Sequence, residues 1–320
     1  MSTQLATVQQ RADLALRSLG FDTSILAGGV AASSSRIYAR DFLAYFGFAG
    51  SPAAALDAAT LARWRSYLAK STALSPNTIN RQIAAVKRLI AEAAAQGYCT
   101  HETAAQFREV RGVKVAALKE RQRATARTRI TPEQMAAICN APDPSTLAGK
   151  MHRALLATLA GTGLRISEAV SLTPAQIEFG TDEEGRSGWL VWVMGKNEIK
   201  PSKRAMSAEA HRLIAAWLGA RAAAGVHSEY IFTGFTGRGS RGPRTTAIRP
   251  SSAWEMIQRY ARKAGLEHIK PHDFRRFVGT ELAKKDLRLA QKQLGHKRIS
   301  TTADNYVLDD IRLGQTDDLY

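Results

Sequence analysis

The chain has 320 residues, of which 45% are hydrophobic, and its 45 Lys and Arg residues against 28 Asp and Glu residues give a formal net charge of +17. This length and hydrophobic content suffice for roughly two domains with buried cores, which excludes a disordered chain. A charge excess of this size favours a polyanionic partner, with nucleic acid as the leading candidate and simple solubility as the alternative.

The sequence does not indicate a zinc-binding, disulfide-rich or membrane-spanning protein. Two cysteines, Cys99 and Cys139, are too few for a disulfide framework and lack the paired spacing of a zinc site. The N-terminus lacks the pattern of a secretory signal, and no uncharged apolar run reaches the length of about 18 residues that a membrane helix needs. We expect a cytoplasmic protein that does not span a membrane.

The first part of the chain predicts a small helical domain. Residues 1–28 are expected to form an amphipathic or loosely ordered lead-in that ends at paired glycines. Residues 29–112 show helical apolar spacing in three segments, the first opened by a serine cap at Ser33–Ser35, the second spanning 57–70 and the third following Ser75. The sequence therefore predicts a helical, core-type DNA-binding domain over residues 29–112.

Basic side chains in this part of the chain are candidates for DNA contact. On the third helix the candidates lie largely away from the apolar stripe, where ordinary solvation is the alternative: Asn80, Arg81, Lys87 and Arg88. Residues 113–129 form a strongly basic segment that we interpret as the interdomain linker. Its candidates for contact with phosphates, again with solvation as the alternative, are Lys119, Arg121, Arg123 and Arg127.

Residues 130–306 predict a second, mixed α+β domain. Thr131 and Pro132 are typical of the start of a helix, as N-cap and first helical residue. Strands are expected near 176–179, 189–194 and 203–206, while the glycine-rich stretch 234–239 is expected to be a mobile loop. The chain is thus predicted to be mainly α-helical with a small antiparallel β-sheet, ending in an acidic tail over 307–320.

The second domain carries a set of residues that together could cleave a phosphodiester without a metal ion. Such a reaction needs cations on the non-bridging oxygens, a nucleophile and a proton donor for the departing oxygen. Arg165 and Arg275 carry guanidinium forks suited to phosphate. His272, three residues before Arg275 and just after Pro271, is expected on the same helix face.

Three further residues complete the candidate site. His296 follows Gly295, whose freedom to bend the backbone could aim the imidazole inward. Tyr306 is the candidate nucleophile, on a short helix that the hydroxyl cluster Ser300–Thr302 is expected to cap. Lys196, in a turn between two strands, is the candidate general acid. Taken singly, each is equally an ordinary packing or surface residue, and the spacing of the histidines argues against a metal site.

Five motifs in this order resemble the tyrosine recombinase, or phage integrase, family. They are Gly163-Leu-Arg-Ile-Ser-Glu168, Gly195-Lys196, His272-x-x-Arg275, Leu294-Gly-His296 and Tyr306. The resemblance covers about residues 131–306, and the helical segment before it is similar to the core-binding domain of that family. A short lead-in favours a layout like that of Xer or Cre, without a separate arm-binding domain.

The resemblance implies a two-domain clamp around double-stranded DNA and a site-specific recombinase. Tyr306 would form a 3′-phosphotyrosyl link, Arg165 and Arg275 would stabilise the phosphate, and His296 would donate to it. His272 would act as base and Lys196 as acid, with Lys200 or Lys203 as alternatives because the turn is long. No metal and no other cofactor is expected.

The resemblance also carries expectations about partners. Strand exchange through a Holliday junction implies a tetrameric synapse of this chain on DNA, with an accessory DNA-bending or directionality protein as a further candidate. The acidic tail is expected either to dock on a neighbouring protomer or to fray. The alternative functions are a catalytically inactive DNA-binding regulator and a type IB topoisomerase-like strand relaxer.

Overall fold

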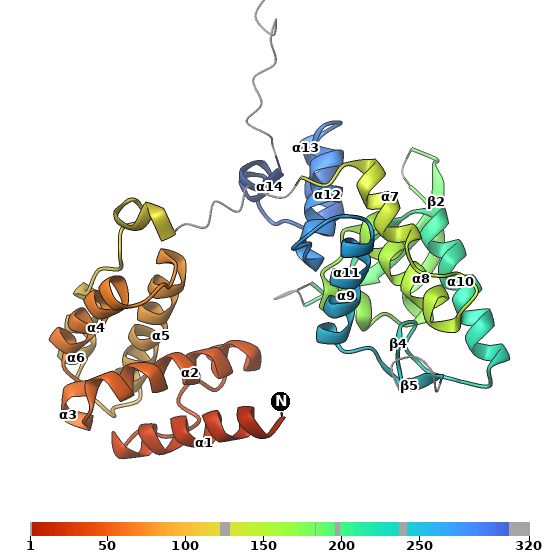
Figure 1. Ribbon diagram of the computed structural model, residues 1–320. Helices are drawn as coiled ribbons and strands as arrows, with labels where there is room; N and C mark the ends of the chain where they lie inside the picture. Colours follow the sequence, from red (N-terminus) through yellow and green to blue (C-terminus); the bar gives the residue numbers. More distant parts are fainter. Residues whose placement is uncertain (1, 122–128, 183, 196–198, 237–241, 307–320) are drawn as a thin grey trace, which may run out of the picture. The chain divides into compact units, whose positions relative to one another are not determined.

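The computed structural model describes residues 2–121, 129–182, 184–195, 199–236 and 242–306, without the side chains of 2–7, 32 and 33. Lys196, Arg123, Arg127 and the acidic tail lie outside the described residues. The chain divides into two compact units, Met1–Ala126 and Arg127–Tyr320, here called the N-terminal and C-terminal units (Figure 1).

The described part of the N-terminal unit is entirely helical. Its elements are α1 (Ser2–Ser18), α2 (Ala32–Ala49), α3 (Pro52–Ala55), α4 (Ala58–Ser71), α5 (Pro76–Ala95), α6 (His101–Glu109) and the 3₁₀ helix η1 (Val115–Arg121). Asp57 and Ser75 cap α4 and α5 by accepting backbone N–H bonds, which satisfies donors that a helix start would otherwise leave open. In the core, the rings of Tyr45 and Trp64 pack 5.2 Å apart.

The start of the chain is more ordered than its sequence predicted. The segment expected as a lead-in forms α1 and buries Leu16, Phe21 and Ile25 in the same core as α2 and α5. The expected serine cap of α2 is wrong, because the helix begins at Ala32 and its N-cap, Ala31, makes no side-chain capping bond. Apolar burial, rather than capping, therefore holds this region in place.

The C-terminal unit combines helices with two small antiparallel sheets, of which the sequence predicted one. Its helices are α7 (Pro132–Asn140), α8 (Leu147–Thr162), α9 (Ile166–Val170), η2 (Pro174–Gln176), α10 (Ala208–Ala223), α11 (Pro250–Lys263), α12 (Pro271–Ala283), α13 (Leu287–Leu294) and α14 (Ile299–Tyr306). Its strands are β1 (Ile177–Thr181), β2 (Ser187–Val193), β3 (Ser202–Met206), β4 (Thr233–Phe235) and β5 (Pro243–Ala247). The expected start of α7 is confirmed, since Thr131 caps it and Pro132 is its first residue.

The strands form one predicted sheet and one unpredicted hairpin. β2 lies between β1 and β3, pairing Val191 with Ile177 on one side and with Arg204 on the other. The expectation of a loop at residues 234–239 is wrong in part, because Gly234 and Phe235 belong to β4, which pairs with β5. The glycine-rich composition of this stretch gave no indication of strand β4, whose partner β5 lies about ten residues further along the chain.

One large core joins most of the helices and the larger sheet of the C-terminal unit, and Val278, Leu294 and Tyr306 form a smaller cluster. Figure 1 shows α8 and α10 side by side, and both helices contribute buried residues to the same core, among them Leu155 and Trp217. Trp217 also donates a hydrogen bond of 2.8 Å from its indole to the carbonyl of Ile231, so its polar atom is satisfied. None of the helices in the described part of the chain combines the length and apolarity that a bilayer crossing requires.

Candidate active site

Arg275 is the most deeply buried charged residue among the predicted site residues, with 2% of its surface exposed. It lies in the second turn of α12 and donates from Nη1 to the carbonyl of Gly163, at 2.8 Å, and from Nη2 to the carbonyl of Leu294. Burial lowers the pKa of Arg275, as does the nearby charge of Arg165, whereas Tyr306 opposes the shift. The guanidinium thus joins the two motifs that the sequence placed far apart.

Arg165 stands at the N-cap of α9, directly after the turn made by Gly163. Glu168 clamps it from both sides: one carboxylate oxygen accepts from the backbone N–H of Arg165 at 2.8 Å and the other from its guanidinium at 2.7 Å. Gly163 has φ +68, and a Cβ there would lie 2.8 Å from Leu294. The turn that presents Arg165 therefore needs glycine both for its conformation and for its close packing.

His296 follows the left-handed Gly295 that ends α13, as its sequence position predicted. Its Nε2 lies 3.2 Å from Nη2 of Arg275 and its Nδ1 lies 2.9 Å from the hydroxyl of Thr302. Burial lowers its pKa to about 4, and the charges of Arg275 and others nearby add to this effect. In the described structure His296 is therefore a neutral imidazole at neutral pH.

Tyr306 is the last residue of α14 and is 3% exposed. Its ring packs against Val278 and Leu294 and lies nearly parallel to the ring of His296, with the ring centres 5.6 Å apart. A Cβ on Gly279 would lie 2.6 Å from Cδ1 of Tyr306, so the absence of a side chain on α12 makes room for the ring. The expected cap at Ser300–Thr302 is wrong, because these residues lie inside α14.

His272 lies in the first turn of α12, one turn before Arg275. Burial lowers its pKa, and the charges of Arg276, Arg275 and Arg165 lower it further. The influence of Arg275 and Arg165 on this pKa places His272 near the other site residues. Five predicted residues are therefore brought together: Arg165, His272, Arg275, His296 and Tyr306.

The sequence reasoning missed two residues that tie this site to the sheet. The side-chain amide of Gln293, on α13, bonds the backbone N–H and C=O of Ala205 on β3, at 3.0 and 2.8 Å, and the carbonyl of Thr162 at the end of α8, at 2.8 Å. The guanidinium of Arg204 occupies the space that a Cβ on Gly295 would need. No sequence motif marked either residue.

The candidate acid Lys196 lies outside the described residues, but its two alternatives do not. Lys200 is exposed. Lys203 lies on β3, with Nζ 3.4 Å from a carboxylate oxygen of Glu178 and 4.7 Å from the ring centre of Trp192. The ammonium of Lys203 is therefore already occupied by an ion pair and an aromatic face.

Two of the predicted DNA contacts on α5 have partners within the N-terminal unit. The amide of Asn80 accepts from the backbone N–H of Val113 at 2.8 Å and donates to its carbonyl at 3.0 Å. Arg81 forms an ion pair with the buried carboxylate of Asp41. A contact between Asn80 and DNA would require these two backbone bonds to open.

The other described candidates of this unit differ in exposure, from the exposed Arg88 and Lys119 to Arg121, whose side chain is 22% exposed. Lys87 donates to the carbonyl of Arg108 at 2.9 Å, and Arg88 lies 3.6 Å from Glu92. Lys119 is exposed. Arg121 donates to the carbonyl of Thr72 at 2.7 Å, which fastens η1 to the end of α4.

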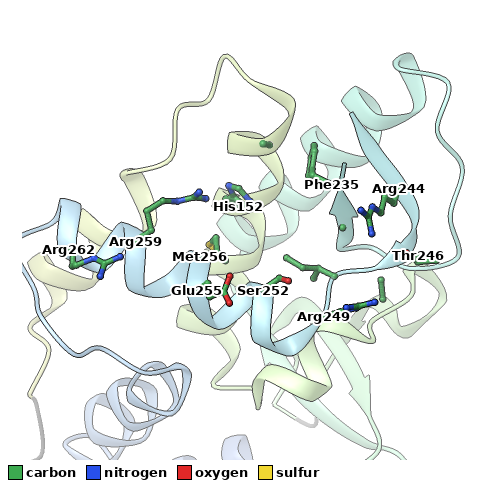
Figure 2. Close-up of a pocket in the computed structure, with 14 residues that line it drawn as sticks. His152, Phe235, Arg244, Thr246, Arg249, Ser252, Glu255, Met256, Arg259 and Arg262 are labelled. Atoms are coloured by element: carbon green, nitrogen blue, oxygen red, sulfur yellow. The ribbon is translucent and has the colours of Figure 1, made fainter. Parts of the chain in front are cut away.

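A basic pocket of about 600 Å³ in the C-terminal unit was not predicted (Figure 2). It lies between α11, the β4–β5 hairpin and α8, and four arginines line it: Arg244, Arg249, Arg259 and Arg262. Glu255 is its one acidic lining residue. His152, also in the lining, lies 3.0 Å from the hydroxyl of Tyr260, and burial lowers its pKa to about 4. The pocket is thus strongly cationic.

Sequence comparisons match both units of the chain to one family. The model of the phage integrase family matches residues 128–311, and that of the phage integrase N-terminal SAM-like domain matches residues 21–97. Tyrosine recombinase XerD of Neisseria meningitidis serogroup A is 33% identical over 184 residues, which cover 55% of this chain and 56% of that protein. This chain therefore matches little more than half the length of that relative. Tyrosine recombinase XerC of Mycobacterium tuberculosis is 29% identical over 284 residues, 86% of this chain and 87% of that protein.

Solved structures share the fold. The XerH site-specific recombinase bound to difH substrate has a TM-score of 0.62 at 19% identity, covering 94% of this chain and 80% of that chain. The Tn1549 transposon integrase in complex with transposon right end DNA has a TM-score of 0.61 at 16% identity, covering 95% of each chain. With a family match over more than half of its length, the chain belongs to the phage integrase family of tyrosine recombinases.

Proposed function

We propose that this protein is a site-specific DNA recombinase that cuts and rejoins strands through a covalent link to Tyr306. The observation that carries this proposal is that Arg165 and Arg275 lie near His296, whose ring stacks on the buried ring of Tyr306. The phenolic oxygen would attack the scissile phosphorus, and the bond from phosphorus to the 5′-oxygen would break. The resulting 3′-phosphotyrosyl link keeps the phosphodiester bond energy, so a 5′-hydroxyl can reverse the reaction.

The two arginines and His296 would hold the phosphate during this exchange. Arg275 is anchored by backbone carbonyls on two elements, so its guanidinium is oriented before a substrate arrives. Arg165 would exchange Glu168 for phosphate oxygens. An anionic phosphate would raise the pKa of His296, and the protonated ring could then donate to a non-bridging oxygen.

Proton transfer would involve His272 and a lysine. The lowered pKa of His272 keeps its imidazole neutral at neutral pH, as a base for the phenolic proton must be. Lys196 would protonate the departing 5′-oxygen, with Lys200 or Lys203 as alternatives. Lys203 would have to leave its ion pair with Glu178, 3.4 Å away, to take this role.

Double-stranded DNA is the proposed partner of both units. The helical domain at residues 29–112, the linker at 113–129 and the catalytic domain at 130–306 would clamp the duplex. The arginines of the basic pocket extend the proposed DNA surface beyond the candidates Lys87, Arg88, Lys119, Arg121, Arg123 and Arg127. We further propose a tetrameric synapse, an accessory DNA-bending or directionality protein, and action in the cytoplasm.

The test begins with duplexes selected from a random library by their binding to the full-length protein. Nicked versions of a selected duplex, in which the cut end diffuses away, should trap a covalent adduct that survives denaturation. Tyr306→Phe should retain binding and form no adduct. Binding by the wild-type protein without any adduct would favour a DNA-binding regulator, whereas relaxation of plasmids that lack the selected site would favour a topoisomerase-like relaxer.

The basic pocket can be tested separately by salt titration. If Arg259 and Arg262 each contact one phosphate, each alanine variant should reduce the slope of log affinity against log salt by about 1. Arg212→Ala is the matched control, because Arg212 already pairs with Glu209 at 2.6 Å. Slopes equal to that of the wild-type protein would remove the pocket from the proposed DNA surface.

A further inference from the structure

Thr302 links the helix of the candidate nucleophile Tyr306 to the candidate phosphate ligand His296. It is fully buried on α14, and its hydroxyl lies 2.9 Å from Nδ1 of His296. It precedes Tyr306 by four residues, so one helical turn places both side chains on the same buried face of α14. A single helix therefore carries the tyrosine and the partner of the histidine.

The contacts of His296 fix its tautomer. Arginine has no hydrogen-bond acceptor, so at 3.2 Å the Nη2 group of Arg275 must donate to Nε2 of His296. Nε2 then carries the lone pair, the proton of the neutral ring is on Nδ1, and Nδ1 donates to the hydroxyl of Thr302. The pKa of about 4 agrees with this neutral ring and results from burial and from the charges of Arg275, Arg165, His272 and Arg204.

This arrangement decides which nitrogen can gain a proton. With Nδ1–H committed to Thr302, the ring can be protonated only at Nε2, which lies beside Arg275. When an anionic phosphate meets Arg275, a proton taken up from solvent at Nε2 would give a donor aimed at the same phosphate. Without the hydroxyl, the ring would be able to rotate or to change tautomer.

We propose that Thr302 is a positioning residue that orients His296 toward the scissile phosphate and makes this orientation depend on the docking of the Tyr306 helix. The proposal rests on the recombinase function proposed above. It joins two requirements of cleavage, because a displaced α14 would remove the nucleophile and release the histidine together. A phosphate would therefore meet a correctly oriented His296 only when Tyr306 is also in place.

The first experiment compares Thr302→Val with Thr302→Ser in the full-length protein, measuring the rate of adduct formation on the selected nicked duplex. Valine keeps the shape of the side chain and removes the acceptor, so we expect a rate at least about tenfold lower, the scale of losing a partner that orients a functional histidine. Serine keeps the hydroxyl and should stay within about threefold of the wild type. Melting temperatures of both variants report any loss of folding.

A double-mutant cycle separates positioning from general support of the fold. In a His296→Ala background, Thr302→Val should cost little further rate, because the group through which it acts is gone. Equal rates for Thr302→Val and the wild type, or a full additional loss in the His296→Ala background, would overturn the role of Thr302. No adduct with the wild-type protein would overturn the proposed function and this role with it.

Discussion

Arg275 donates a hydrogen bond of 2.8 Å to the carbonyl of Gly163, although 112 positions of sequence separate the two residues. Gly163 ends α8 and stands two residues before Arg165. The same bond therefore holds one arginine of the candidate site and fixes the turn that presents the other. Folding and the proposed phosphate binding would therefore depend on the same atoms.

Replacing Arg275 by lysine should damage both properties. An ammonium cannot reproduce the fork, so buried carbonyls lose their donors at a cost of about 1–3 kcal/mol each. We expect cleavage of the selected nicked duplex to fall by at least about 100-fold. Arg165→Lys should reduce cleavage on a similar scale but change the free energy of unfolding by less than about 1 kcal/mol, because its side chain is 42% exposed. Near-native cleavage by either variant would contradict the roles of these arginines.

Gly279→Ala should displace the candidate nucleophile. The added Cβ would meet the Tyr306 ring at 2.6 Å, and overpacking of this kind costs about 1–3 kcal/mol. Because a shift of about 1 Å at a reacting group can cost about 100-fold, adduct formation should fall on that scale. Gly219→Ala on α10 is the matched control: a Cβ there meets nothing within 4 Å, so stability should rise by about 0.5–1 kcal/mol with cleavage unchanged.

A substrate with an altered leaving group can identify the general acid. With a sulfur atom in place of the 5′-bridging oxygen, the departing thiolate needs no proton. Lys196→Ala should therefore cleave the normal duplex slowly and the sulfur-containing duplex at close to the wild-type rate. Lys203→Ala should behave like the wild type on both, since Glu178 and Trp192 already hold its ammonium. Rescue of Lys203→Ala instead would transfer the role to Lys203.

Acid should weaken the fold through His152. Its pKa of about 4 lies below the value near 6.5 of an unfolded chain, so the unfolded state binds the proton first as pH falls. This contribution to stability is present above pH 6.5 and is lost as pH falls toward 4, amounting to up to about 2 kcal/mol between pH 7 and pH 5. Urea unfolding of His152→Gln should show a smaller pH dependence than the wild type. The exposed His101→Gln variant should retain the wild-type dependence, and identical slopes for all three proteins would contradict the prediction.

The sequence predicted the candidate site mainly through side chains with distinctive chemistry. The ordered motifs predicted a site of two arginines, two histidines and a tyrosine. The structure brings Arg165 and Arg275 together with His272, His296 and Tyr306. The positioning contacts were not predictable in the same way. Thr302 looked like a helix cap, and nothing in the pattern marked Gln293, because their partners are set by tertiary packing.

Glu168, the last residue of the first motif, makes a contact that its spacing in the sequence indicates. It follows Arg165 by three positions, which is the spacing at which a carboxylate reaches back to a helix N-cap. The arginine-lined pocket could not be found this way, because Arg244 on the hairpin and Arg259 on α11 meet only after both elements fold. Contacts between residues of one helix can be inferred from their spacing in the sequence, but contacts between separate elements cannot.

The three hydrogen bonds of Gln293 join elements that are synthesised at different times. They join α13 to the end of α8, 131 positions earlier, and to β3, 88 positions earlier. A chain still emerging from the ribosome has Arg165 and the larger sheet long before it has α13 and α14. A nascent chain would therefore lack the proposed nucleophile Tyr306, and the contacts that hold α13 against α8 and β3, until these later helices have been synthesised.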